Sequence, residues 1–301
     1  MDPSRQLCKI QDSFTSKENR KPQIKKYKDE PEVGSPRTRR NKMRTDEIYT
    51  IDKPQMVLVK EELADPFARY SSKTFGKKGI VLANVDAVYN FSKQEDGYLK
   101  PQVMKEFNYA CLDYDPEIIK YMQYRMPLSV GFTPCGKKDE SQIDYRLINS
   151  ACDAKSLVNY VLKIVPNVDL IISTGVKNYK DALVSALKLC KPGGTFVAQI
   201  DENTNNLTDH YITSLCFDTF SLFKPLSENL NENHSFLIAE NYKGNSLDWI
   251  DLLEANEIGI KISESFLKYE QDYYDSLSQL KNNIDDEEYN LYKSLALWNI
   301  F

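Results

Sequence analysis

The sequence predicts an α/β fold in which helices cover both faces of a mostly parallel, seven-stranded sheet. Short, continuously apolar runs recur along the chain, as expected of strands that are buried on both faces. Segments with helical spacing of apolar residues separate most of these runs, which favours parallel strands. The last two runs have no helix between them, which predicts that the sheet ends in an antiparallel hairpin.

The first part of the sheet is predicted from three apolar runs. Gly79–Val85 (GIVLANV) and Phe107–Leu112 (FNYACL) have the length and composition of buried strands. Pro116 then opens a helix, because proline fits the first turn of a helix. Leu147–Ser150 is a weaker strand, and Asp153 is placed to cap the helix that follows it.

The second part of the chain gives clearer signals. Val168–Ser173 (VDLIIS) predicts a buried strand, and the helix that follows it ends at the chain breaker Pro192-Gly193-Gly194. Three further strands are predicted, at Thr195–Ile200, Asp218–Lys224 and Ser235–Asn241. Three further helices are predicted, at Leu207–Cys216, Ser263–Lys281 and Asp285–Phe301.

The distribution of charge divides the chain into three parts. Residues 1–45 hold thirteen Lys or Arg and six Asp or Glu, a net charge of +7, although the whole chain carries −5. A basic segment with few apolar residues predicts a disordered arm. Residues 46–245 hold the α/β pattern. Residues 246–301 form a helical extension, interpreted either as a cap on the core or as a docking element for a protein partner.

The basic arm predicts contact with RNA or DNA, because clustered cations attract phosphate groups without reading sequence. Alternative interpretations are an address signal or a solubilising tail. No apolar run is long enough to span a membrane, and the N-terminus lacks the apolar core of a signal peptide. These features predict an intracellular protein, cytoplasmic or nuclear, without a membrane partner. The residues expected to contact RNA are Arg37, Arg39, Arg40, Lys42 and Arg44.

Two counts exclude further classes of protein. The six cysteines include no CxxC pair, which argues against a zinc ribbon or a disulfide framework. With only His210 and His234 in the chain, a histidine-rich metal site is not expected. The frequent Asn, Lys and Tyr residues are typical of an AT-rich coding genome, such as a viral one.

Four segments occur in the same order as the corresponding segments of one known family. They are VDLIISTG, Lys191-Pro192-Gly193-Gly194, Lys224-Pro225 and Asn241-Tyr242-Lys243-Gly244. Over residues 55–245 the chain resembles the FtsJ-type RNA ribose 2′-O-methyltransferases. The resemblance implies a Rossmann-like class I methyltransferase fold and S-adenosylmethionine as the cofactor. It also implies a ribose 2′-hydroxyl of RNA, in an mRNA cap or in rRNA, as the methyl acceptor.

The resemblance also indicates where the catalytic residues of the family would lie. In that family a Lys-Asp-Lys-Glu tetrad activates the 2′-hydroxyl, which is a poor acid. The equivalent positions here are Lys60, Thr174, Gln199 and either His234 or its neighbour Asn233, so three of the four charged groups are replaced. Glu232 or Glu240 takes the place of the family's glutamate only if the strand register slips, and a slip by one residue turns a side chain to the other face.

The cofactor loop departs from the family as well. In the family this loop follows the first strand and is rich in glycine, but no glycine follows Gly79–Val85 before Gly97. The pair Phe91-Ser92 keeps the family's aromatic-serine ending. Asp113, at the end of the second predicted strand, is placed to accept from ribose hydroxyls, and Asp153 from the adenine amino group. Binding of S-adenosylmethionine is therefore implied by the resemblance and weakened by these departures.

Two functions from different classes follow. The favoured one is a catalytically inactive methyltransferase fold that binds RNA or regulates a partner, similar in plan to the inactive small subunits of poxvirus mRNA capping enzymes. The alternative is an active cap or rRNA ribose 2′-O-methyltransferase with shifted catalytic residues. An open cavity with a lysine flanked by carboxylates at its mouth would favour the alternative. No GxGxxG or GKS/GKT loop supports a third type, a doubly wound protein for another nucleotide.

Overall fold

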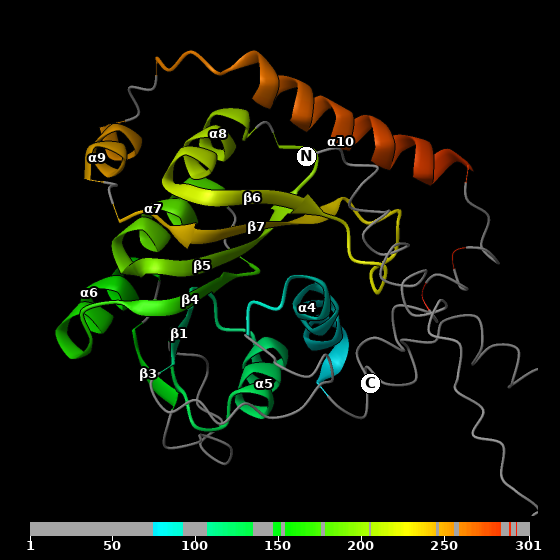
Figure 1. Ribbon diagram of the computed structural model, residues 1–301. Coiled ribbons are helices and arrows are strands. Elements are labelled where there is room, and N and C mark those ends of the chain that lie inside the picture. The colour runs from blue at the N-terminus through cyan, green and yellow to red at the C-terminus, as the bar shows by residue number, and fades with distance from the viewer. Residues whose placement is uncertain are drawn as a thin grey trace, which may run out of the picture.

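A computed structural model describes residues 75–92, 107–134, 147–151, 154–175, 178–204, 206–244, 247–255 and 259–283, together with Tyr289 and Lys293. Within these residues the centre is a seven-stranded sheet of order β3-β2-β1-β4-β5-β7-β6 (Figure 1). Strands β1 to β5 pair with one another in parallel, and β7 pairs antiparallel with both β5 and β6. The predicted class, an α/β fold that ends in an antiparallel hairpin, is confirmed.

Most elements lie where the sequence predicts them. The exceptions are helix α4, which replaces a predicted strand, and strand β2 and helix α9, which were not predicted. The strands are β1 Asn108–Cys111, β2 Val130–Pro134, β3 Leu147–Ala151, β4 Val168–Ser173, β5 Cys190–Asp201, β6 Phe217–Phe223 and β7 His234–Tyr242. The helices are α4 Gly76–Tyr89, α5 Pro116–Arg125, α6 Ala154–Ile164, α7 Tyr179–Leu189, α8 Leu207–Cys216, α9 Leu247–Ala255 and α10 Glu264–Asn283.

The run Gly79–Val85 is helical, so the prediction of a first strand there was wrong. It lies inside α4, which packs beside α5. Ile80, Leu82 and Val85 are almost completely buried, because this helix is enclosed on most sides. A short apolar run does not distinguish a buried strand from a buried helix. The first strand of the sheet is therefore β1, the run predicted as the second strand.

Strand β2 was not predicted, because its sequence VGFTP contains both glycine and proline. Gly131 is required here, since a Cβ atom would lie 2.4 Å from the ring of Tyr109 on the neighbouring strand β1. The aromatic ring of one strand thus fills the space above the glycine of the next.

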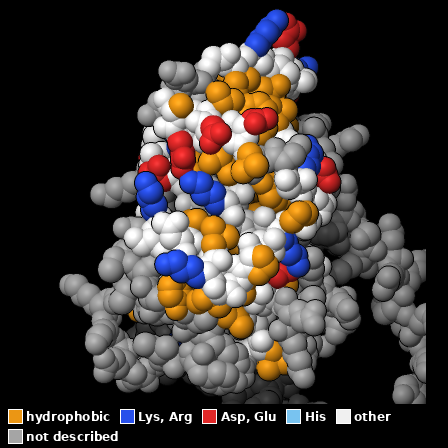
Figure 2. Space-filling model, turned by 90° about the vertical axis from the view of Figure 1, so that its left-hand side faces the viewer, with side chains coloured by type: hydrophobic (Ala, Val, Ile, Leu, Met, Phe, Trp, Pro, Cys, Tyr) orange, Lys and Arg blue, Asp and Glu red, His pale blue; other side chains and the backbone are white. Residues whose placement is uncertain are grey.

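Two hydrophobic clusters bury the two faces of the sheet. Helices α6, α7 and α8 contribute to one cluster, together with Phe196 and Ala198 of β5. Helices α4 and α5 contribute to the other, together with Val197 of the same strand. This alternation along β5 is the period of two that a strand imposes. Figure 2 shows the side that carries α6 and α9, where apolar side chains reach the surface. Ile164 of α6 and Leu247 of α9 are among the exposed large apolar residues.

Helix α10 packs on the same core as the sheet. Its residues Phe266, Tyr273 and Leu277 are buried, and the last two belong to the cluster of α7 and α8. Through this apolar face, α10 covers part of the core. Most of the predicted helix Asp285–Phe301 lies outside the described residues. None of the helices described has the combination of length and apolarity that a membrane span requires.

Candidate functional site

The strand order reverses between β1 and β4, the point at which open α/β sheets bind ligands. Asp113, two residues beyond β1, lies at this point. Its Oδ2 accepts hydrogen bonds from the backbone nitrogens of Thr174 at 2.8 Å and Gly175 at 3.0 Å, and from the Ser173 hydroxyl at 3.2 Å. Burial raises the pKa of Asp113, while the hydrogen bonds from Gly175 and Thr174 oppose that rise. The carboxylate therefore bridges the ends of β1 and β4.

The loop that follows the first strand is thus residues 112–115, and not the segment beyond residue 85. This loop also contains no glycine. Asp113 ends the first strand rather than the second, and its Oδ2 is engaged by the connection after β4. Asp115 caps α5 by accepting from the backbone nitrogen of Glu117 at 3.0 Å.

Phe91 and Ser92 do not belong to a cofactor loop, because they follow a helix and not a strand. Phe91 is 2% exposed and packs in the cluster of α4 and α5. The Ser92 hydroxyl donates to Asp86 at 2.5 Å, and the Tyr121 hydroxyl donates to the same carboxylate oxygen at 2.5 Å. These contacts give the Phe91-Ser92 pair a structural role just after the C-terminal end of α4.

A cleft of about 530 Å³ opens at the carboxyl ends of β4 and β5. Thr174 lines it from the loop after β4, Gln199 from the end of β5, and His234 from the start of β7. The structure thus brings together three of the four positions that the resemblance marks as catalytic. The fourth, Lys60, lies outside the described residues, as does Asp153.

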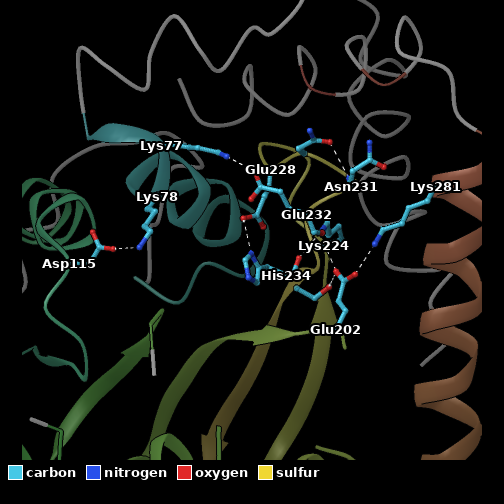
Figure 3. A network of polar contacts seen from close by, with 12 residues as sticks. Lys77, Lys78, Asp115, Glu202, Lys224, Glu228, Asn231, Glu232, His234 and Lys281 are labelled. Atoms are coloured by element: carbon cyan, nitrogen blue, oxygen red, sulfur yellow. Dashed lines mark hydrogen bonds and ion pairs between the residues drawn. The ribbon is translucent and has the colours of Figure 1, made fainter. Parts of the chain in front are cut away.

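Two lysines that sequence reasoning did not single out reach the cleft from the first turn of α4 (Figure 3). The Nζ atom of Lys77 lies 2.6 Å from Oε1 of Glu232, and that of Lys78 lies 2.7 Å from Oδ2 of Asp115. The hydrogen bond from Lys77 lowers the pKa of Glu232. The sequence indicates that Lys77 and Lys78 belong to the site only when the apolar run that follows them, Gly79–Val85, is recognised as a helix.

The loop between β6 and β7 supplies two carboxylates to the cleft, and His234 at the start of β7 adds an imidazole. The side chain of Glu228 is 6% exposed, and its Oε1 lies 3.9 Å from Nδ1 of His234. Burial raises the pKa of Glu228 to about 7; the charge of Lys224 opposes this rise, and Glu232 adds to it. One potential ligand atom from each of Glu228, Glu232 and His234 lies within 4.8 Å of the others, so this trio could hold a metal ion.

A buried ion pair holds this loop in place. Lys224, the lysine of the Lys-Pro pair, donates to Oε1 of Glu202 at 3.1 Å and to the backbone oxygens of Glu232 and His234, the latter at 2.6 Å. Lys281 of α10 donates to the other oxygen of Glu202 at 2.8 Å. Burial lowers the pKa of Lys224. Although burial opposes the change, the hydrogen bond from Lys281 lowers the pKa of Glu202.

The strand order and the antiparallel β7 define the class of this protein: it has the Rossmann-like fold of the class I methyltransferases. No family model matches the sequence, and no curated protein matches it either.

The chain is similar to several solved methyltransferase-type structures at low sequence identity. One is the fibrillarin pre-rRNA processing protein of Methanococcus jannaschii, with 14% identity over 47% of this chain and 70% of that chain and a TM-score of 0.38. Another is a putative ribosomal RNA methyltransferase from Plasmodium falciparum, with 13% identity over 56% and 97% and a TM-score of 0.40. A third is the MycE methyltransferase of mycinamycin biosynthesis, solved with Mg and SAH, with 11% identity over 59% and 55% and a TM-score of 0.39. Similarity at this level concerns the fold alone.

Proposed function

We propose that this chain is a catalytically inactive protein of the RNA 2′-O-methyltransferase type that binds RNA and serves as a regulatory or scaffold subunit. One observation carries the proposal: Thr174 and Gln199 line the cleft where the resembling family has Asp and Lys. Neither a hydroxyl nor an amide takes up a proton at neutral pH, so neither can act as a base toward a ribose hydroxyl. General-base catalysis contributes about 10²- to 10⁴-fold to such reactions.

The end of β1 supports the same proposal. A cofactor bound at the switch point needs a close approach of the backbone, which glycine permits. Residues 112–115 offer no glycine, and the Asp113 carboxylate is bonded across the crevice to Thr174 and Gly175. These residues do not fit S-adenosylmethionine, and we propose no methyl-transfer step through it.

RNA binding and partner binding rest on other parts of the chain. The RNA contacts are proposed for the basic arm, through the cluster Arg37, Arg39, Arg40, Lys42 and Arg44. A protein partner is proposed at the C-terminal helices, supported by the exposed apolar side chains of Leu247 on α9 and Leu267 on α10.

The second candidate function is an active cap or rRNA ribose 2′-O-methyltransferase. One observation favours it: Lys77 places an amine in the cleft, 2.6 Å from Glu232, and Glu228 lines the same cleft. In this alternative Lys77 takes over the role of the missing family lysine at position 199.

Two measurements test the proposed function. Calorimetry with S-adenosylmethionine is expected to show no binding, and radiolabelled methyl transfer to capped mRNA or rRNA is expected to remain at background. Transfer above background would refute inactivity. If the alternative holds, Lys77→Met abolishes that transfer, whereas Lys188→Met, which removes an equal charge from the surface pair with Glu254, preserves it.

A further inference from the structure

Glu228, Glu232 and His234 present three metal-binding side chains to one point at the edge of the cleft (Figure 3). One potential ligand atom from each residue lies within 4.8 Å of the others. Around a bound zinc ion, ligand atoms at about 2.1 Å from the metal lie about 3.4 Å apart in tetrahedral geometry. The side chains of Glu232 and His234 are 36% and 47% exposed, so small rotations can close the remaining gap.

A second observation points to a ligand at this place. Oε2 of Glu228 is buried and has no hydrogen-bond partner among the described residues. A buried carboxylate oxygen without a partner is costly. Its neighbour is a second carboxylate, that of Glu232, so the two groups repel each other unless a proton or a cation lies between them.

Two of the three residues, Glu232 and His234, have their backbone held by contacts that need no metal ion. Lys224 donates to the backbone oxygens of Glu232 and His234, and its own charge is paired with Glu202. His234 also begins β7, where it pairs in register with Asp201 of β5. A site built on a restrained backbone loses less entropy on binding a ligand.

We propose that these three residues bind a divalent first-row transition cation, with Zn²⁺ and Mn²⁺ as the expected occupants. Two carboxylates and one imidazole suit these ions, whereas Mg²⁺ and Ca²⁺ prefer oxygen donors alone. Three protein ligands leave a coordination position for water or for an oxygen atom of a ligand in the cleft. The site needs one histidine, so it does not conflict with the small number of histidines in the chain. It goes beyond the proposed function and does not depend on it.

Lys77 is the natural competitor of such a cation. Its Nζ lies 2.6 Å from Oε1 of Glu232, and its side chain is 59% exposed. The amine can swing into solvent when a divalent ion replaces it. Removal of this amine is therefore expected to tighten metal binding severalfold.

The chain's two histidines make the test specific. His234 is half exposed at the cleft, whereas His210 is buried and contacts Glu270. We would titrate the full, chelator-treated chain with zinc chloride and follow both imidazoles by NMR, with calorimetry in parallel. The expected result is one site, with the His234 resonance shifted and the His210 resonance unchanged. Unchanged His234 resonances, or the absence of binding, would overturn the proposal.

Substitutions then locate the site. Glu228→Gln and His234→Gln are each expected to weaken zinc binding at least about tenfold. His234→Gln is the safer variant for folding, because the side chain is half exposed. Glu254→Gln, an exposed acid paired with Lys188, is the matched control and is expected to leave the affinity unchanged. Lys77→Met should tighten binding, and Lys188→Met should not. Undiminished affinity in both Glu228→Gln and His234→Gln would refute the site.

Discussion

Asp113 accepts a 2.8 Å hydrogen bond from the backbone nitrogen of Thr174, which joins the end of β1 to the end of β4. The same oxygen accepts a second backbone hydrogen bond from Gly175. In an open α/β sheet this is the crevice where a ligand is expected. Here a protein carboxylate spans it, and the first prediction concerns that carboxylate.

Replacing Asp113 with alanine is expected to destabilise the fold by about 1–3 kcal/mol, because the backbone N–H of the buried residue Thr174 loses its acceptor. Urea unfolding measures the change. The matched control is Asp218→Ala, which removes an exposed carboxylate from β6. Equal stability of the two variants would show that the bridge contributes nothing.

Glu202 predicts a pH dependence of stability. Its pKa in the folded chain lies below its usual range, so its contribution is present above about pH 4.3 and is lost as the pH falls through the folded value. Glu202→Gln is expected to cost about 3–5 kcal/mol at pH 7, since it leaves Lys224 buried without its charge partner. Thermal unfolding from pH 7 to pH 3 should show the difference between variant and parent shrinking. A difference that stays constant over this range would contradict the assignment.

The buried pair of Asp86 and Arg125 predicts a large loss of stability. The two side chains are 3% and 0% exposed, and Arg125 Nε lies 3.5 Å from Asp86 Oδ2. Asp86→Ala is expected to cost about 3–5 kcal/mol, because the buried guanidinium of Arg125 loses this carboxylate. The double variant Asp86→Leu with Arg125→Met should recover part of this loss in chemical denaturation. Asp251→Ala, on the exposed face of α9, serves as the control. A loss no larger than that of this control would contradict the expectation.

The basic arm predicts salt-dependent RNA binding. Replacing its five clustered cations with glutamine is expected to weaken binding to single-stranded RNA and to flatten its salt dependence. If all five contact phosphates, the slope of log affinity against log salt changes by about 3.5. Filter binding over a range of salt concentrations measures the slope. The same number of changes at Lys9, Lys17, Arg20, Lys21 and Lys25 is the control, and an equal effect there would show that the cluster has no special role.

Much of the sheet could be predicted, because buried parallel strands are continuously apolar. Val168–Ser173 and Leu207–Cys216 have the predicted bounds. The helix α4 could not be distinguished, since its central run GIVLANV is apolar and rich in β-branched residues, which also favours a strand. That one error moved the expected cofactor loop from residues 112–115 to the segment beyond residue 85.

The cleft was predictable only where the family resemblance supplied positions. Thr174, Gln199 and His234 meet there because the ends of β4 and β5 and the start of β7 lie side by side. Glu228 was missed, because the loop of residues 225–234 is rich in Asn and Glu and has the composition of a surface linker. Leu226 and Leu230 of that loop are buried, and Glu228, which lies between them in the sequence, is buried with them.

Helix α10 connects the far end of the described chain to the proposed metal ligands. The Tyr273 hydroxyl donates to the hydroxyl of Ser235 at 2.8 Å, and Ser235 directly follows His234. Lys281 neutralises Glu202 from the same helix. A protein that displaced α10 from the sheet would remove both contacts. If that displacement also moved His234, docking of such a protein and occupancy of the proposed cation site would be reciprocally coupled, so that each would change the affinity of the other by the same factor.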